Sequence, residues 1–370
     1  METARQHVVP LTSIRIFAAV LVVVFHYGRG VWPFADGALH RISASAGSSV
    51  AFFFFLSGYI LAYAYQGFAW RQAGALRDYY VARLARIYPL YLLALLAAIA
   101  VGWGNVYWDR LSALNAAVDF PIHAGLLQAW LPDRVFRWNV PGWSLSVEAS
   151  FYLLFPLVAA PVLALRRGAA LAAFAGLYLV SQAGWAIARS WIWVDWFYRS
   201  HAVHHLLMYH PVIYWPVFAL GMLAFRIVRD EIVHPRLSPA GMGILSALAL
   251  AAIVFCAYAA GDRMNYSIHV GLMAPVYGAL LFSLGDARNG VARLLSARWL
   301  HYLGEASYGV YILQLPVYGV WRLAGVVPSE SAAGFYLYLA SLLAVSALLF
   351  RWFEIPMRRW MRRALSGRPQ

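Results

Sequence analysis

Long runs of apolar residues, separated by shorter polar segments, recur along the whole sequence. A helix needs about 20 consecutive apolar residues to cross the hydrocarbon core of a bilayer, and these runs reach that length. The pattern predicts an all-α, polytopic membrane protein with about ten transmembrane helices in a single membrane domain over residues 1–370. The expected spans are 9–28, 46–66, 84–104, 143–165, 169–188, 209–226, 238–260, 266–285, 300–322 and 333–353.

The arginines between these runs predict how the chain is oriented. All 29 basic residues are arginine. If the N-terminus is inside, 18 lie in segments that face the cytoplasm, 9 lie in the opposite segments, and Arg15 and Arg351 lie within spans. Cytoplasmic loops of membrane proteins carry an excess of Lys and Arg. We therefore expect both termini in the cytoplasm, at the inner membrane of a bacterium. The first run is long and contains Arg15, so no cleavable signal peptide is expected.

The overall composition agrees with a membrane protein. Hydrophobic residues make up 63% of the 370 and charged residues 12%, whereas a soluble domain carries about 25% charged residues. The net charge of +14 raises the question of nucleic acid, but the arginines are spread between apolar runs, so we expect no nucleic-acid partner. The C-terminal segment RRWMRRALSGR is instead expected to contact anionic membrane lipids.

The first predicted span contains both an arginine and a histidine in LTSIRIFAAVLVVVFHYG, residues 11–28. Ionisable residues inside a membrane helix are costly and mark function by default. Arg15 and His26 are eleven positions apart, which corresponds to three turns plus about 20° of rotation and about 16 Å along the axis. We expect both side chains on one inward-facing stripe. The alternative is an arginine that reaches the interface and a histidine that bonds a backbone carbonyl.

Two later spans carry polar residues at matching depths. Arg83 and Arg86 lie one turn apart at the cytoplasmic level of the third span, and Glu148 lies near the outer end of the fourth, at the level of His26. Arginine forks suit phosphates, so we expect the phosphates of a cytosolic acyl-CoA at these arginines and at Arg15. Its thioester would reach His26, the general base or transient acyl carrier, and Glu148 would hold the imidazole. The alternatives are ordinary cytoplasmic arginines and a helix-capping carboxylate.

Six motifs then occur in the order found in one family. They are Arg15…His26, FFFFLSGYIL (52–61), RLARIYP (83–89), WSLSVEASFYLLFP (143–156), SYGVYILQLPV (307–317) and FEIPMRR (353–359). On these motifs the chain resembles the acyltransferase-3 family of integral membrane acyltransferases. The resemblance implies that His26 is catalytic, that the arginines bind the acyl-CoA donor, and that the acyl group passes to an outward-facing acceptor, often a polysaccharide.

Two positions depart from the family pattern. Relatives often have histidine where this chain has Gln314, so we expect no proton transfer at that residue. Many relatives begin LDGLRG where this chain has LTSIRI, which marks a subgroup.

The sequence thus predicts an O-acyltransferase, foremost an O-acetyltransferase that uses acetyl-CoA. The expected acceptor is a hydroxyl of a carbohydrate, such as an exopolysaccharide or a lipid-linked oligosaccharide. Acylation of a small molecule or a glycolipid is the alternative among enzymes. A different class is a proton-coupled exporter or flippase with His26 and Glu148 as its relay.

Three further residues are candidate contacts of the acceptor. Trp143 and Ser146 lie in the motif of the fourth span, where the indole would stack on a sugar ring, and Tyr308 lies in the ninth span. Helix packing is the alternative role for Tyr308.

Two other polar patterns are given no catalytic role. HAVHHLLMYH (201–210) places His201 and His205 on one helical face, but no cysteine or carboxylate completes a ligand set. We expect no metal there, and an acceptor-facing or interfacial position. Glu354 and Arg358 are spaced i, i+4 around Pro356, and we expect them to form the structural end of the last span.

Overall fold

The computed structural model describes residues 2–102, 113–192, 201–233, 237–269, 271–286 and 288–366. Within these ranges the chain contains helices and no strand, which confirms the all-α class. The α-helices are α1 (Glu2–Val23), α2 (Gly37–Ala44), α3 (Ser49–Tyr65), α4 (Ala75–Ala100), α6 (Ala113–Ala124), α7 (Gly142–Ala164), α8 (Arg167–Ile192), α9 (His201–Tyr209), α10 (Pro211–Val233), α11 (Pro239–His269), α12 (Ala274–Leu284), α13 (Gly290–Leu295), α14 (Arg298–Leu323), α15 (Ala332–Leu349) and α16 (Ile355–Ser366). The 3-10 helices are η2 (Ala46–Ser48), η3 (Gln128–Trp130), η4 (Pro132–Arg134) and η6 (Pro328–Glu330), and the π-helices are η1 (Val24–Gly28) and η7 (Phe350–Glu354).

Eight helical stretches within the described residues are long and apolar enough to cross a membrane. They are Val9–Gly28, Gly37–Tyr65, Ala75–Ala100, Gly142–Ala164, Arg167–Ala188, Ala202–Glu231, Pro239–Ala260 and Ala332–Leu365. A polytopic membrane fold is therefore supported, whereas the count of ten is not confirmed.

Two of the ten expected spans fall short of this standard. The expected span 266–285 is divided between the end of α11 and the short α12, which has 11 residues. The expected span 300–322 does form a helix, α14, of 26 residues, but α14 is not among the eight apolar stretches because Tyr, Gly, Pro and Gln interrupt its aliphatic residues. The direction of the spans across the membrane remains a prediction.

The helices gather into two compact units, each built from parts of the chain that are far apart in sequence. The first comprises Met1–Gly67, Val158–Trp193 and Tyr214–Ser307, and the second comprises Phe68–Leu157, Val194–Ile213 and Tyr308–Gln370.

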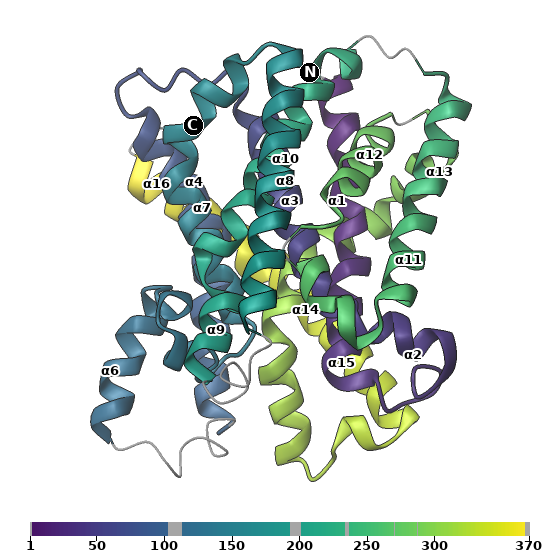
Figure 1. Cartoon of the computed structure of the whole chain (residues 1–370). Coiled ribbons are helices and arrows are strands. Elements are labelled where there is room, and N and C mark those ends of the chain that lie inside the picture. Colours follow the sequence, from purple (N-terminus) through teal and green to yellow (C-terminus); the bar gives the residue numbers. More distant parts are fainter. Residues whose placement is uncertain are drawn as a thin grey trace. The chain divides into compact units, whose positions relative to one another are not determined.

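In the first unit, two glycines let α3 and α10 touch through their backbones. A Cβ atom on Gly58 would overlap the carbonyl oxygen of Phe218, and one on Gly221 would overlap the carbonyl oxygen of Phe55. The two helices lie side by side in Figure 1. Small residues allow such close approach between membrane helices, where van der Waals packing replaces the hydrophobic drive.

A third glycine fixes α1 against the start of α14. A Cβ atom on Gly304 would overlap the carbonyl oxygen of Thr12. The adjoining part of α1 is buried from Leu11 to Ile14. The first span is thus held by backbone contact three residues before Arg15.

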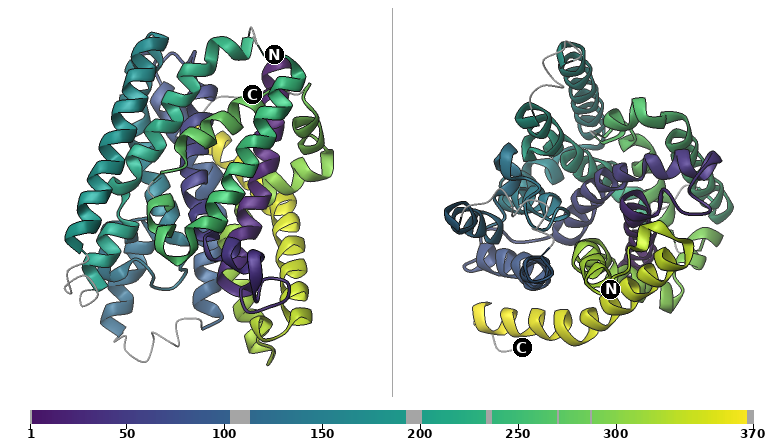
Figure 2. Two further views of the ribbon diagram at one scale, coloured as in Figure 1. Left: turned by 45° about the vertical axis from the view of Figure 1, so that its right-hand side comes forward. Right: turned by 90° about the horizontal axis from the view of Figure 1, so that it is seen from below.

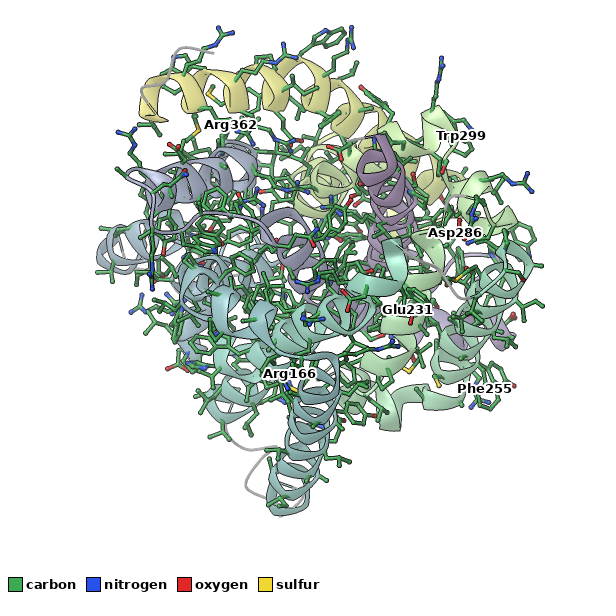
Figure 3. The ribbon with its side chains drawn as sticks, turned by 90° about the horizontal axis from the view of Figure 1, so that it is seen from above. Arg166, Glu231, Phe255, Asp286, Trp299 and Arg362 are labelled. Atoms are coloured by element: carbon green, nitrogen blue, oxygen red, sulfur yellow. The ribbon has the colours of Figure 1, made fainter. Side chains whose placement is uncertain are left out.

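Helix α8 lies at the rim of the first unit. In Figure 3 it begins beside the labelled Arg166 and extends away from the other helices of this unit. Only 6% of its most apolar stretch is buried. Its described contacts include an ion pair from Arg167 to Glu231 and a hydrogen bond from Tyr178 to the carbonyl oxygen of Leu272. The exposed apolar surface is suited to lipid.

The second unit is organised around α4 and α7. The hydroxyl of Tyr79 donates to the carbonyl oxygen of Tyr152, and the Tyr79 ring stacks on Phe155 at 5.7 Å. Helix α16 packs against α4 and lies across it in the right-hand view of Figure 2, where α4 is seen nearly end-on. An arginine-rich helix in this orientation is typical of a segment at the membrane surface.

We expect Gly221→Ala to lower the thermal unfolding temperature of the protein in detergent. The added methyl group would force α3 and α10 apart, and overpacking of this kind costs about 1–3 kcal/mol or more. Gly176→Ala in α8 is the matched control, because no atom lies within 4 Å of the new Cβ atom and alanine favours a helix. Equal unfolding temperatures for both variants would contradict the backbone contact.

Candidate active site

The first span ends in a π-helix that contains its histidine. His26 is the central residue of η1, the five-residue π turn Val24–Gly28. Single π turns inside α-helices are rare and frequent at functional sites. The α-helical rotation predicted between Arg15 and His26 therefore holds only as far as Val23.

His26 has solvent-accessible surface although protein surrounds it at depth, as for a residue that faces an internal space. Its ring meets Phe25 edge-on at 5.0 Å, and its nitrogens have no hydrogen-bond partner among the residues that the structure describes. Both nitrogens are thus available to a substrate, as a general base or a nucleophile requires. Arg15 is half-buried on the same helix.

In the second unit, one tyrosine connects the predicted acid to the predicted arginines. The Tyr152 hydroxyl donates to a Glu148 carboxylate oxygen one turn earlier in α7. The Arg83 guanidinium lies 5.8 Å from the centre of the Tyr152 ring, and Arg86 is also within electrostatic range of that tyrosine. Three of the predicted site residues are therefore brought together.

This arrangement differs from the expected depths. The sequence placed Glu148 at an outer level and the arginines about three turns toward the cytosol, but Tyr152 alone spans the gap between Glu148 and Arg83. Helical side chains lean toward the N-terminus of their helix, and this direction takes Tyr152 back to Glu148. His26 belongs to the first unit and Glu148 to the second, so their pairing remains a prediction.

Tyr308 joins the same polar cluster from α14. Its hydroxyl donates to the carbonyl oxygen of Ile87 in α4 at 2.6 Å, and Glu148 and Glu354 lie within electrostatic range. This hydrogen bond gives Tyr308 a helix-packing role as well as a place beside the acids.

Sequence reasoning missed Glu354 as a member of this cluster. The residue closes the π-helix η7, is 2% exposed, and forms an ion pair of 2.6 Å with Arg358. The pair expected at the end of the last span is therefore present, although Pro356 lies between its members. An acid between apolar residues, in FEIP, was the available signal.

Buried amide groups line the start of α7 in the second unit. Gln128 is 1% exposed, and its Nε2 donates to the carbonyl oxygen of Gly142 at 2.8 Å and to the Tyr91 hydroxyl at 3.1 Å. Its Oε1 has no hydrogen-bond partner in the described part of the chain. A buried carbonyl without a donor costs free energy, which a hydroxyl-bearing ligand would relieve.

Two more amides show the same imbalance. Asn139 donates to the carbonyl oxygen of Ile312 at 3.1 Å, and Gln314 donates to that of Tyr311 at 2.7 Å. Asn139 Oδ1 and Gln314 Oε1 are buried and accept no hydrogen bond from any described residue. Gln314 thus offers an acceptor rather than a titratable group.

Trp143 and Ser146 are both buried at the start of α7. The Trp143 indole packs edge-on against Tyr209 at 4.9 Å. The Ser146 hydroxyl donates to the carbonyl oxygen of Leu126 and accepts from the Ala129 amide. Ser146 therefore holds the 126–129 turn on α7, and its contact with the acceptor stays a prediction.

The loop before α7 is tied together by one buried acid. Asp119 is fully buried and pairs with both Arg134 and Arg137. His123, 1% exposed, uses Nδ1 to bond the backbone carbonyl of Asp119, and its ring lies 5.3 Å from that of Trp138. Burial lowers the pKa of His123 to about 4, so the ring is neutral at pH 7.

The histidine segment 201–210 packs onto this loop. His205 Nδ1 lies 2.8 Å from the carbonyl oxygen of Pro132, and His210 meets Trp130 edge-on at 5.1 Å. The side chain of His201 lies outside the described residues. Among the side chains that are described, no group of three His, Cys, Asp or Glu is arranged to hold a metal ion.

Comparison with known proteins identifies a family that matches most of the chain. A family model described as an acyltransferase domain, Acyl_transf_3, matches residues 11–351. Over 161 residues the chain is 34% identical to a protein named acyltransferase MdmB from Streptomyces mycarofaciens; the match covers 40% of this chain and 38% of that relative. The chain is thus matched to less than half the length of the relative. No solved structure matches.

We expect stability to fall between about pH 6.5 and pH 4 because of His123. Its folded-state pKa is lowered to about 4, so below pH 6.5 the unfolded chain takes up the proton first. Stability is complete above pH 6.5 and falls by at most about 1.4 kcal/mol per pH unit below it.

Thermal unfolding from pH 7.5 to pH 4.5 measures this effect. Asp119, Arg134 and Arg137 face His123 and stay in place in the comparison variant His123→Asn, whose amide can still donate to the Asp119 carbonyl. Parallel pH curves for the native protein and this variant would contradict the assignment.

Proposed function

The chain belongs to the Acyl_transf_3 family of acyltransferases, and from this premise we propose that it is a membrane O-acyltransferase that moves an acyl group, foremost acetyl, from cytosolic acyl-CoA to a hydroxyl of an outward-facing carbohydrate. The observation that carries the proposal is the accessible His26 imidazole in the π turn of the first span. The proposal places both termini in the cytoplasm of a bacterial cell.

The reaction needs one base and one anion site. His26 takes the proton of the acceptor hydroxyl while the hydroxyl oxygen attacks the thioester carbonyl carbon. The C–S bond then breaks, CoA leaves as a thiolate, and the imidazolium returns the proton to the sulfur. Arg15, Arg83 and Arg86 bind the phosphates of the donor, which keeps the thioester in reach of His26.

The buried amide oxygens support a hydroxylated acceptor. Gln128, Asn139 and Gln314 each keep one buried oxygen without a donor in the described residues, and a carbohydrate supplies several O–H donors. A wholly apolar acceptor would leave these oxygens unsatisfied. Carbohydrate therefore fits this part of the second unit better than lipid chains do.

Deleting the gene and analysing surface glycans and glycolipids by mass spectrometry would identify the acceptor by its lost acyl mass. With that acceptor, we expect His26→Ala to lower kcat by at least about a hundredfold, as loss of a general base does. His301→Ala, on another helix, is the control and should keep normal turnover. Normal acyl transfer by folded His26→Ala protein would reject the proposal. Radiolabel left on quenched native enzyme by acetyl-CoA would identify an acyl-histidine intermediate instead of base catalysis.

We expect Gln314→Met to raise the KM for the acceptor about tenfold and to leave the KM for acetyl-CoA unchanged. The two side chains are similar in length, and the change removes one hydrogen-bond acceptor, worth about 1–1.5 kcal/mol. Steady-state kinetics with each substrate varied in turn measures both constants. An equal rise in both KM values would assign Gln314 to packing.

A further inference from the structure

Arg226 of α10 is a buried arginine that the sequence gives no reason to separate from other cytoplasmic arginines. It lies five residues before the end of the apolar stretch Ala202–Glu231, which is about 7.5 Å inside that stretch. The residue is 6% exposed, and its neighbours Ala224 and Phe225 are buried as well. An arginine that only marked the cytoplasmic side would extend its guanidinium into water.

The Arg226 guanidinium has donors that nothing uses. Its Nε and Nη1 have no hydrogen-bond partner among the described residues. The carboxylate of Asp230 lies 3.7 Å from Nη1, beyond hydrogen-bond distance, and its side chain is 61% exposed. Burying unused donors of a charged group costs free energy unless a ligand accepts from them.

The charged residues near Arg226 are more exposed or are paired with each other. Arg229, three residues later, is 33% exposed and lies 3.5 Å from the same Asp230. Glu231 pairs with Arg167 at 2.8 Å. The ion pair of Arg226 with Asp230 therefore leaves its Nε and Nη1 donors unused.

The depth of Arg226 matches that of Arg15 in the same unit. Arg15 lies six residues beyond Val9, about 9 Å into the first span. The start of α1 and the end of α10 lie at the same end of the first unit in Figure 1. Helix α3 contacts α1, and it touches α10 at Gly58 and Gly221. Helices α1 and α10 therefore both pack against α3.

We propose that Arg226 is an additional phosphate ligand for the acyl-CoA donor. A guanidinium presents its donors in a fixed fork that matches phosphate oxygens, and two of the Arg226 nitrogens, Nε and Nη1, are free to donate. This inference rests on the proposed function, because it names a further residue for the donor that the function requires.

The test compares acetyl-CoA with acetyl-pantetheine, which lacks every phosphate. We expect Arg226→Gln to weaken the binding of acetyl-CoA to purified protein about ten- to a hundredfold in isothermal titration, as loss of hydrogen bonds to a charged group does. Turnover with acetyl-pantetheine as the donor should be unchanged. Arg226→Lys keeps the charge without the fork and should recover part of the affinity. Arg229→Gln is the matched control and should bind acetyl-CoA like native protein.

Each outcome decides a different claim. Native affinity of Arg226→Gln for acetyl-CoA would overturn the role of Arg226 and leave the proposed function standing. Equal losses with acetyl-CoA and acetyl-pantetheine would also overturn it, because they would show that the residue supports the fold. No binding of acetyl-CoA by native protein would overturn the proposed donor and, with it, this inference.

Discussion

Direct backbone contact between membrane helices is the constraint on which the first unit depends. Gly58 and Gly221 leave no side chain between α3 and α10, and Gly304 leaves none between α14 and α1. In lipid the helices gain little from hiding apolar surface, so shape at these contacts sets their spacing. Arg15 and Arg226 extend from helices that are positioned in this way.

The second unit is held by tyrosine hydroxyls that reach across helices. Tyr79 bonds the backbone of α7, and Tyr308 bonds the backbone of α4. Within α7, Tyr152 bonds Glu148 beside Arg83. Hydrogen bonds are stronger in a low-dielectric interior than in water. Tyr79 and Tyr308 therefore fix the helices, and Tyr152 lies between an acid and an arginine.

The sequence was sufficient for the helical membrane class because length and apolarity determine it. The predicted span 266–285 was wrong. Helix α11 continues to His269, and Gly271, with φ +93°, then turns the chain before α12 begins. Spacing found Arg83, Arg86 and Glu148, but not their common contact, Tyr152, since that depends on side-chain direction. The role of Arg226 could not be predicted, because burial and unused donors leave no trace in a list of arginines.

The interleaving of the two units has a consequence for synthesis. The hydrogen bond between Tyr308 and Ile87 joins residues 221 positions apart, so α4 enters the membrane long before its partner is translated. At 5–20 residues per second, α4 waits roughly 10 to 45 s. During that interval the guanidinium groups of Arg83 and Arg86 must hydrogen-bond to water, to lipid phosphates or to the insertion machinery. The order of translation thus favours arginine at these positions, because its long side chain can reach the membrane interface whereas a short acidic side chain cannot.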